Sequence, residues 1–167
     1  MSSASEATFQ FDADTAVRPA VDRAASWTAE VSSDYNIGEN PNGGYLMAIV
    51  LQALRAELEG VEPPLGQPDP LTLTAHFLRP GIPDADARIV TEVRKLGRSI
   101  TTARATLEQG DKVRVEMMAG FGDLSSATSQ FDDITVAPPD LPPPDRCVDR
   151  AELVQGVDLP LLNRVGC

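Results

Sequence analysis

The segment from Tyr45 to Leu58 constrains the fold of this chain more than any other. It carries no charge before Arg55 and is rich in Leu, Ala and Met, which favour a helix. It is longer than a typical strand, and apolar side chains would lie on almost every side of the helix. Such a helix is stable only if other elements cover it. We therefore expect one long buried helix, ended by Gly60 and Pro63-Pro64.

Strand-like segments flank this helix. Residues 27–37 predict one strand before it, with Trp27, Ala29 and Val31 on one side. Four strands are predicted after it, and Gln109-Gly110-Asp111 predicts a hairpin turn between the last two. These four are Leu71–Leu78, with Leu71, Leu73, Ala75 and Phe77 on one face, then Ala87–Leu96, Ser99–Glu108 and Lys112–Phe121. An antiparallel sheet curled around one helix satisfies both patterns, so we expect an α+β architecture with a single core.

The chain divides into four expected regions. Residues 1–26 form an N-terminal arm, in which Thr8 to Phe11 alternates like a short strand. Residues 27–123 hold every strong periodic signal and form the domain. Residues 124–150 form a proline-rich, extended linker, and residues 151–167 form a short C-terminal segment. That last segment is too short to bury its own apolar side chains.

Composition excludes several classes of partner. Acidic residues outnumber basic ones 25 to 14, for a net charge of −11, which argues against nucleic acid and anionic membrane surfaces. The chain has neither an apolar run of membrane-spanning length nor a signal-like N-terminus, so we expect a cytoplasmic protein. Cys147 and Cys167 are expected to be reduced thiols. We expect no metal and no separate cofactor, because no Cys/His cluster or phosphate-binding loop is present.

Several motifs, in order, resemble a known family. Asn42-Gly43-Gly44-Tyr45 entering the helix, Phe77-Leu78-Arg79-Pro80-Gly81 ending a strand, and Leu96-Gly97-Arg98-Ser99-Ile100 are similar to motifs of the acyl-CoA thioesterase II family. Gln109-Gly110 and Ala119-Gly120-Phe121 fall where that family has its last hairpin. The resemblance implies a hot-dog fold over residues 27–123, an antiparallel sheet wrapped around one long central helix. It also implies acyl-CoA thioesters as substrates, with CoA as part of the substrate.

The family normally carries two hot-dog domains in one chain. Residues 151–167 resemble the opening of the second, so this chain is expected to pair with a second hot-dog domain or to form a homodimer. The resemblance also implies that an Asp, a Ser or Thr, and a Gln act in the second domain. Overlaying that pattern on this half places Thr72 at the Asp position, Ser99 at the Ser or Thr position and Met118 at the Gln position. Only Ser99 matches the residue type of the family. This half therefore resembles the non-catalytic partner.

The start of the helix is the candidate catalytic element. Thioester hydrolysis needs hydrogen-bond donors for the developing oxyanion, and a helix that begins at Gly43-Gly44 offers unpaired backbone N–H groups. We expect the amides of Gly44 and Tyr45 to face the thioester oxygen, with Asn42 assisting. The alternative is a plain loop-to-helix turn in which glycine permits close packing against the sheet.

The general base is less well defined. Gln52 stands near the position where one group of single-domain thioesterases places a Glu; it could orient a water but not deprotonate it. Asp34 and Glu39 are candidates by position for the Asp that another group places before the helix, or they are solvated loop acids. His76, the only histidine, is a candidate general base or substrate contact, and the alternative is a surface or interface residue.

Substrate binding is predicted for Gly43, His76, Ser99 and two arginines. Arg79 and Arg98, with Arg94 and Lys95, could receive the phosphates of CoA against the acidic background. They are equally explained as strand-end charges that protect a sheet edge. The sequence thus predicts an acyl-CoA thioesterase that hydrolyses or binds fatty acyl-CoA. The alternative is a non-catalytic acyl-CoA-binding or structural module.

Overall fold

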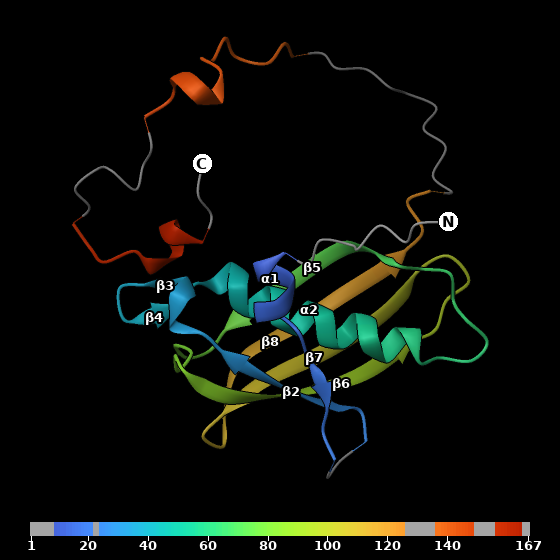
Figure 1. The fold of residues 1–167 in the computed structure, drawn as a ribbon. Helices are drawn as coiled ribbons and strands as arrows, with labels where there is room; N and C mark the ends of the chain where they lie inside the picture. Colours follow the sequence, from blue (N-terminus) through green and yellow to red (C-terminus); the bar gives the residue numbers. More distant parts are fainter. Residues whose placement is uncertain (1–8, 22–23, 126–135, 149–155, 165–167) are drawn as a thin grey trace, which may run out of the picture.

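A six-stranded antiparallel sheet curves around one long helix, α2 (Figure 1). The computed structural model describes residues 9–21, 24–125, 136–148 and 156–164. The strand order is β1-β2-β6-β7-β8-β5. The strands are β1 (Arg18–Pro19), β2 (Ser26–Val31), β5 (Asp69–Phe77), β6 (Ala85–Lys95), β7 (Thr101–Gln109) and β8 (Lys112–Gly122). The expected α+β architecture with one core is confirmed.

Helix α2 spans Gly43–Glu59, so the predicted helix is confirmed and begins two residues earlier. It packs mainly against β2, β6, β7 and β8. Small side chains on the inner face of these strands let the helix approach the sheet closely, and several face one another across strands, as Ala103 faces Ala119. The buried residues of α2 are Tyr45, Leu46, Ile49, Val50, Ala53, Leu54 and Leu58.

The four predicted strands after the helix are confirmed, with ends shifted by a few residues. The hairpin between β7 and β8 turns through Gly110 and Asp111, whose φ angles are 55° and 57°. Two successive positive φ angles are typical of the turn whose twist matches a two-residue hairpin. The strand predicted over residues 27–37 is shorter, because β2 ends at Val31. The Ser32 side chain then accepts a hydrogen bond from the Asp34 amide and turns the chain into a 3₁₀ helix, η1 (Ser33–Tyr35).

A β-bulge in β5 corrects the predicted alternation of this strand. Pairing with β8 shifts between Pro70 and Thr72, which leaves Leu71 as the extra residue. Leu71 lies over Gly122, where an added Cβ would come within 2.5 Å of Leu71 Cδ1. Leu73, Ala75 and Phe77 oppose the buried residues of β8 and face inward, but Leu71 does not share their face.

The described part of the N-terminal arm is helical where a strand was predicted. Helix α1 covers Gln10–Asp14, so the alternation of Thr8 to Phe11 was misleading. Helix α1 lies at the start of α2, and only the later residues Arg18–Pro19 of the described arm pair with β2 at the sheet edge. The Phe11 ring packs edge-on against Tyr35 with centroids 5.8 Å apart.

A short two-stranded hairpin, β3 (Asn36–Ile37) with β4 (Asn40–Pro41), leads into α2. The C-terminal segment contacts it: the Gly38 amide donates to the Asp158 carbonyl at 2.6 Å. Two further 3₁₀ helices are η2 (Pro144–Arg146) and η4 (Pro160–Asn163). Cys147 is exposed and free, and Cys167 lies outside the described residues. The assignment of 124–150 as linker and 151–167 as the opening of a second domain stays a prediction.

Candidate functional site at the start of helix α2

The first turn of α2 is fixed by Asn42. Its side-chain Oδ1 accepts a hydrogen bond from the Tyr45 amide at 3.2 Å, and its own amide donates to the Tyr35 carbonyl at 2.9 Å. This is an N-cap, which satisfies one of the amides that a helix leaves unpaired. The Tyr45 amide is therefore occupied. In the part of the chain that the structure describes, the amides of Gly43 and Gly44 have no hydrogen-bond acceptor.

Both glycines are needed where they stand. A Cβ on Gly44 would lie 3.0 Å from Asn42 Oδ1, and a Cβ on Gly43 would lie 3.0 Å from the Phe77 ring. Phe77 ends the inner face of β5, and its ring lies against the first turn of α2 although 52% of the side chain is exposed. The loop-to-helix turn therefore has a packing role, and it also leaves two amides that a ligand oxygen can approach.

A buried polar cluster holds the start of α2 from the other side. The Tyr45 hydroxyl donates to the Asp14 carbonyl and accepts from the Ser32 amide, both at 3.0 Å, while the Tyr35 hydroxyl donates to Asp14 Oδ2 at 3.0 Å. The two tyrosine rings stack with centroids 4.2 Å apart. Burial, followed by the hydrogen bond to Asp14, raises the pKa of Tyr35 to about 12. Burial also raises the pKa of Tyr45. Both phenols are thus held neutral.

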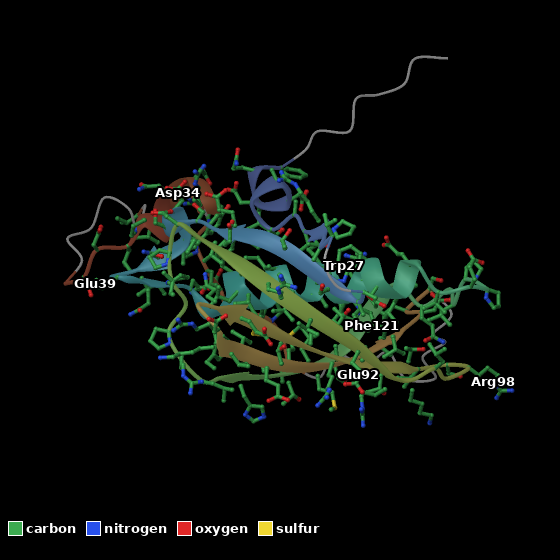
Figure 2. All side chains as sticks on the ribbon, turned by 90° about the horizontal axis from the view of Figure 1, so that it is seen from below. Trp27, Asp34, Glu39, Glu92, Arg98 and Phe121 are labelled. Atoms are coloured by element: carbon green, nitrogen blue, oxygen red, sulfur yellow. The ribbon has the colours of Figure 1, made fainter. Side chains whose placement is uncertain are left out.

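In the described part of the chain, the carboxylates of the two candidate acids form no hydrogen bond with the start of α2; one is paired and the other is exposed. Asp34 forms an ion pair with Arg164 of the C-terminal segment. The hydrogen bond to the Asp34 carboxylate raises the pKa of Arg164. Glu39 is exposed at the tip of the β3–β4 hairpin, at the edge of the molecule in Figure 2. Gln52 is half-buried and lies eight residues beyond Gly44, about 12 Å along the helix axis.

The predicted substrate contacts do not lie together, because some are at one end of the molecule and some at the other. Arg79 lies just after β5, at the Gly43 end, where its Nη1 donates to the Val113 carbonyl at 3.0 Å. Arg98 and Ser99 lie in the β6–β7 turn at the far end of α2; Figure 2 shows Arg98 opposite Asp34 and Glu39. Successive antiparallel strands place alternate turns at opposite ends of a sheet, and that rule could have separated Arg79 from Arg98 at the sequence level.

His76 lies on the outer face of the sheet. It is exposed and pairs across the strands with Glu116, while its neighbour Phe77 faces α2. Because adjacent strand residues point to opposite faces, His76 does not meet Gly43 and Gly44 within this chain. Two of the positions from the family overlay, Thr72 and Met118, share that outer face, and Ser99 lies in the far turn.

The predicted basic cluster is partly neutralised. Arg94 and Arg104 both form ion pairs with Glu92, and these two partners lower the pKa of Glu92. Arg94 therefore offers less net charge to a phosphate than the sequence indicated. Among the described residues, no group of His, Cys, Asp or Glu has the geometry of a metal site. No helix in the described part has the length and apolarity to cross a membrane.

Sequence reasoning missed the residues that shape this site through tertiary contacts. The sequence placed Phe77 on one face of a strand but gave no sign that its ring contacts Gly43. Asp14 and Tyr35 are 21 residues apart in the chain and were not connected. The helix-start motif located the turn, and the local cap by Asn42 decides which amides stay open; the packing around that turn comes from distant segments.

Comparison with known proteins agrees with this architecture. Residues 31–122 match the family described as acyl-CoA thioesterase N-terminal domain. The thioesterase-like protein TwmA of Talaromyces wortmannii is 42% identical over 86 residues, which are 51% of this chain and 23% of TwmA.

Two solved structures extend the match. A putative thioesterase II from Thermobifida fusca YX superposes with a TM-score of 0.70 at 28% identity, covering 84% of this chain and 48% of that protein. A protein of unknown function with a hot-dog fold from Alicyclobacillus acidocaldarius gives a TM-score of 0.72 at 26% identity, covering 94% and 53%. This chain spans about half the length of these structures and about a quarter of TwmA. The fold is a hot-dog fold, and the chain belongs to the acyl-CoA thioesterase N-terminal domain family.

Proposed function

We propose that this chain binds the thioester of a fatty acyl-CoA at the start of α2 and contributes to its hydrolysis. The observation that carries the proposal is the pair of unpartnered amides at Gly43 and Gly44, at the positive end of a 17-residue helix. Donors fixed before the reaction stabilise an oxyanion without reorganisation. The predicted pair of Gly44 and Tyr45 becomes Gly43 and Gly44, because Asn42 occupies the Tyr45 amide.

The group that activates water is proposed to come from a second hot-dog domain. Both candidate acids are in settings that do not favour this role, since Asp34 is paired with Arg164 and Glu39 is exposed at a hairpin tip. Strand β5 is a sheet edge with a single neighbour, and its inner-face residues Leu73 and Phe77 are 40% and 52% exposed. An edge strand with exposed apolar side chains favours pairing with another sheet. The partner is a second copy or a second domain of the same fold.

A non-catalytic role is the second candidate, and the settings of the same two acids favour it. In that case the chain would hold acyl-CoA, or stabilise a partner domain, without turnover. Stabilisation of the protein by acyl-CoA without release of thiol would identify this role. Neither stabilisation nor release would leave only the structural role.

The test uses release of free CoA thiol from acyl-CoA substrates, measured with a thiol reagent. Gly44→Ala places a methyl group 3.0 Å from Asn42 Oδ1, disturbing the cap and covering the open amide, and should lower kcat/KM about 100-fold. Gly60→Ala is the matched control: it sits at the other end of α2, and its Cβ meets only ordinary contacts at 3.5 Å. Equal rates in both variants would exclude the helix start as the oxyanion site.

A further inference from the structure

The loop that joins β5 to β6, residues 78–84, is held by one buried side chain. Gln109, the last residue of β7, is only 3% exposed. Its Oε1 accepts a hydrogen bond from the Ile82 amide at 2.8 Å. Its Nε2 donates to the carbonyls of Ile82 at 2.8 Å and Ala85 at 3.4 Å. Both ends of this amide side chain are therefore bonded to the backbone of the loop and of the strand that follows it.

The loop lies against the start of α2. Gly81 is buried, and a Cβ on it would lie 3.1 Å from Leu46 Cδ1 and 3.3 Å from Pro41 Cγ. Pro41 and Leu46 stand on either side of the two open amides in the sequence. The Phe77 ring, which directly precedes the loop, contacts Gly43. The end of β5 and this loop thus form one wall of the proposed thioester site.

The middle of the loop depends on Gln109 for its hydrogen bonds. Before it, the Pro80 carbonyl accepts from Arg114 Nη1 at 3.0 Å, and after it, the Asp84 amide donates to a carbonyl of β2 at 2.6 Å. Between these anchors, in the part of the chain that the structure describes, the hydrogen bonds of residues 81–83 all go to Gln109. Loss of these bonds would leave the loop attached at its ends but unfixed where it meets the helix.

We infer that Gln109 is a positioning residue for the proposed thioester site. The inference rests on the proposed function and adds to it a residue that acts through the loop and not on the ligand. Gln109 holds Gly81 against the first turn of α2, and this wall sets the space in which a thioester oxygen approaches the amides of Gly43 and Gly44. The alternative is that Gln109 stabilises the loop without any effect on the site.

Gln67 provides a matched control for this alternative. It is also a buried glutamine, 9% exposed, and its Nε2 donates to the carbonyls of Gly97 and Arg98 at 2.8 and 3.1 Å. These bonds hold the β6–β7 turn, at the far end of α2 from Gly43. Gln109→Leu and Gln67→Leu therefore remove the same kind of buried side-chain bond at opposite ends of the molecule.

The test compares the affinities of the full chain for octanoyl-CoA and for free CoA, measured by calorimetry. Free CoA has no thioester carbonyl, and unfolded protein would weaken both probes equally, so the ratio of the two affinities reports on the thioester site and not on stability. The ratio should fall about tenfold in Gln109→Leu, a typical loss when a supporting residue is removed, and stay unchanged in Gln67→Leu. In a chain with isotope-labelled glycine, the amide signals of Gly43 and Gly44 should shift in the first variant only.

The outcomes separate this inference from the proposed function. An unchanged ratio in Gln109→Leu, or an equal fall in both variants, would overturn the positioning role and leave the thioester site standing. Equal wild-type affinity for the two probes would overturn the thioester site and the positioning role with it. Gly81→Ala inserts a methyl group 3.1 Å from Leu46 Cδ1 and displaces the loop with Gln109 in place. It should lower the same ratio, and it replaces Gln109→Leu if that variant does not fold.

Discussion

Helix α2 has a covered side and an open flank, and the two differ in how completely the rest of the chain buries them. On the covered side, Tyr45, Leu46, Ile49 and Ala53 are at most 2% exposed, because the sheet and the N-terminal arm close over them. On the open flank, Gly43, Met47 and Leu51 are only half-buried, and Gly43 lies against the exposed Phe77 ring of β5. The covered side is fully buried by residues of this chain. The open flank is an apolar surface that the described residues cover only in part, and the proposed thioester site begins there.

The covered side also contains its own polar partners. Thr91 Oγ1 on β6 lies 2.9 Å from Glu57 Oε2 and 3.1 Å from the Ala25 carbonyl, and its one proton is donated to one or the other. Together with the cluster of Asp14, Tyr35 and Tyr45, this satisfies polar groups that burial would otherwise penalise. On the open flank the first-turn amides are left without such partners. The difference indicates that the covered side serves stability and the open flank serves binding.

The largest expected effect comes from matched leucine truncations on the two sides. Leu46→Ala removes a side chain that is only 2% exposed and should lower the free energy of unfolding by about 3 kcal/mol. Leu51→Ala removes a half-buried side chain and should cost about 1 kcal/mol, because solvent already reaches it. Urea denaturation followed by circular dichroism measures both. Equal costs would mean that the open flank is covered as completely as the other side.

The second prediction concerns what covers the open flank. Leu73→Glu places a charge on the exposed inner face of β5 and should weaken self-association at least tenfold, because a charge would be buried between two hot-dogs. Thr74→Glu places the same charge on the outer face of the same strand and should have a smaller effect. Sedimentation velocity over a concentration series measures the association constant. A wild-type chain that stays monomeric throughout would exclude the homodimer and leave pairing with a second domain.

The third prediction tests the cap between the two sides. Asn42→Ala leaves the Tyr45 amide without its acceptor and should destabilise the fold by about 1 kcal/mol. Asn42→Asp keeps a side-chain oxygen in place and should retain most of the stability. Thermal unfolding of the two variants gives the comparison. The same loss in both would show that the cap geometry does not hold the first turn.

The sequence predicted the covered side well, for a physical reason. A helix with apolar residues on most sides and strands with alternating residues each demand a complementary surface, so α2 and its four following strands could be located from periodicity alone. The hairpin at Gly110 and Asp111 was predicted for the same kind of local reason. Apolar pattern, however, does not say what covers a side chain. Met47 and Leu51 have the same character as Leu54, and only the structure shows that they face an open flank.

The candidate site was predicted in position but not in composition. Asn42, Gly43 and Gly44 mark the helix start by local signals, since capping and glycine preferences act within a few residues. The occupation of the Tyr45 amide by Asn42 is local too, but the contact of Phe77 with Gly43 and the ion pair of Asp34 with Arg164 depend on tertiary contacts. Arg164 lies 130 residues from Asp34, a separation over which sequence pattern carries no signal.

The smallest expected effect is a change in stability at high pH from the covered side. The pKa of Tyr35 is about 12 in the folded chain, raised from 10.0 by burial and by its hydrogen bond to Asp14. Below pH 10 the phenol is neutral in both states, and this contribution is fully present. Between pH 10 and 12 the unfolded chain releases the proton while the folded chain keeps it. Stability should therefore fall as pH rises through this window.

Tyr35→Phe removes this proton and should make the decline in stability between pH 10 and 12 shallower in guanidinium titrations. The slope should not vanish, because the pKa of Tyr45 is also raised by burial and its hydroxyl stays in place. The variant also loses the bond to Asp14 at every pH, so the slope is the quantity to compare, not the absolute stability. An unchanged slope would mean that water reaches the Tyr35 phenol. Solvent would then reach the covered side at the start of α2 as it reaches the open flank. The two sides would no longer differ in solvent access near the proposed site.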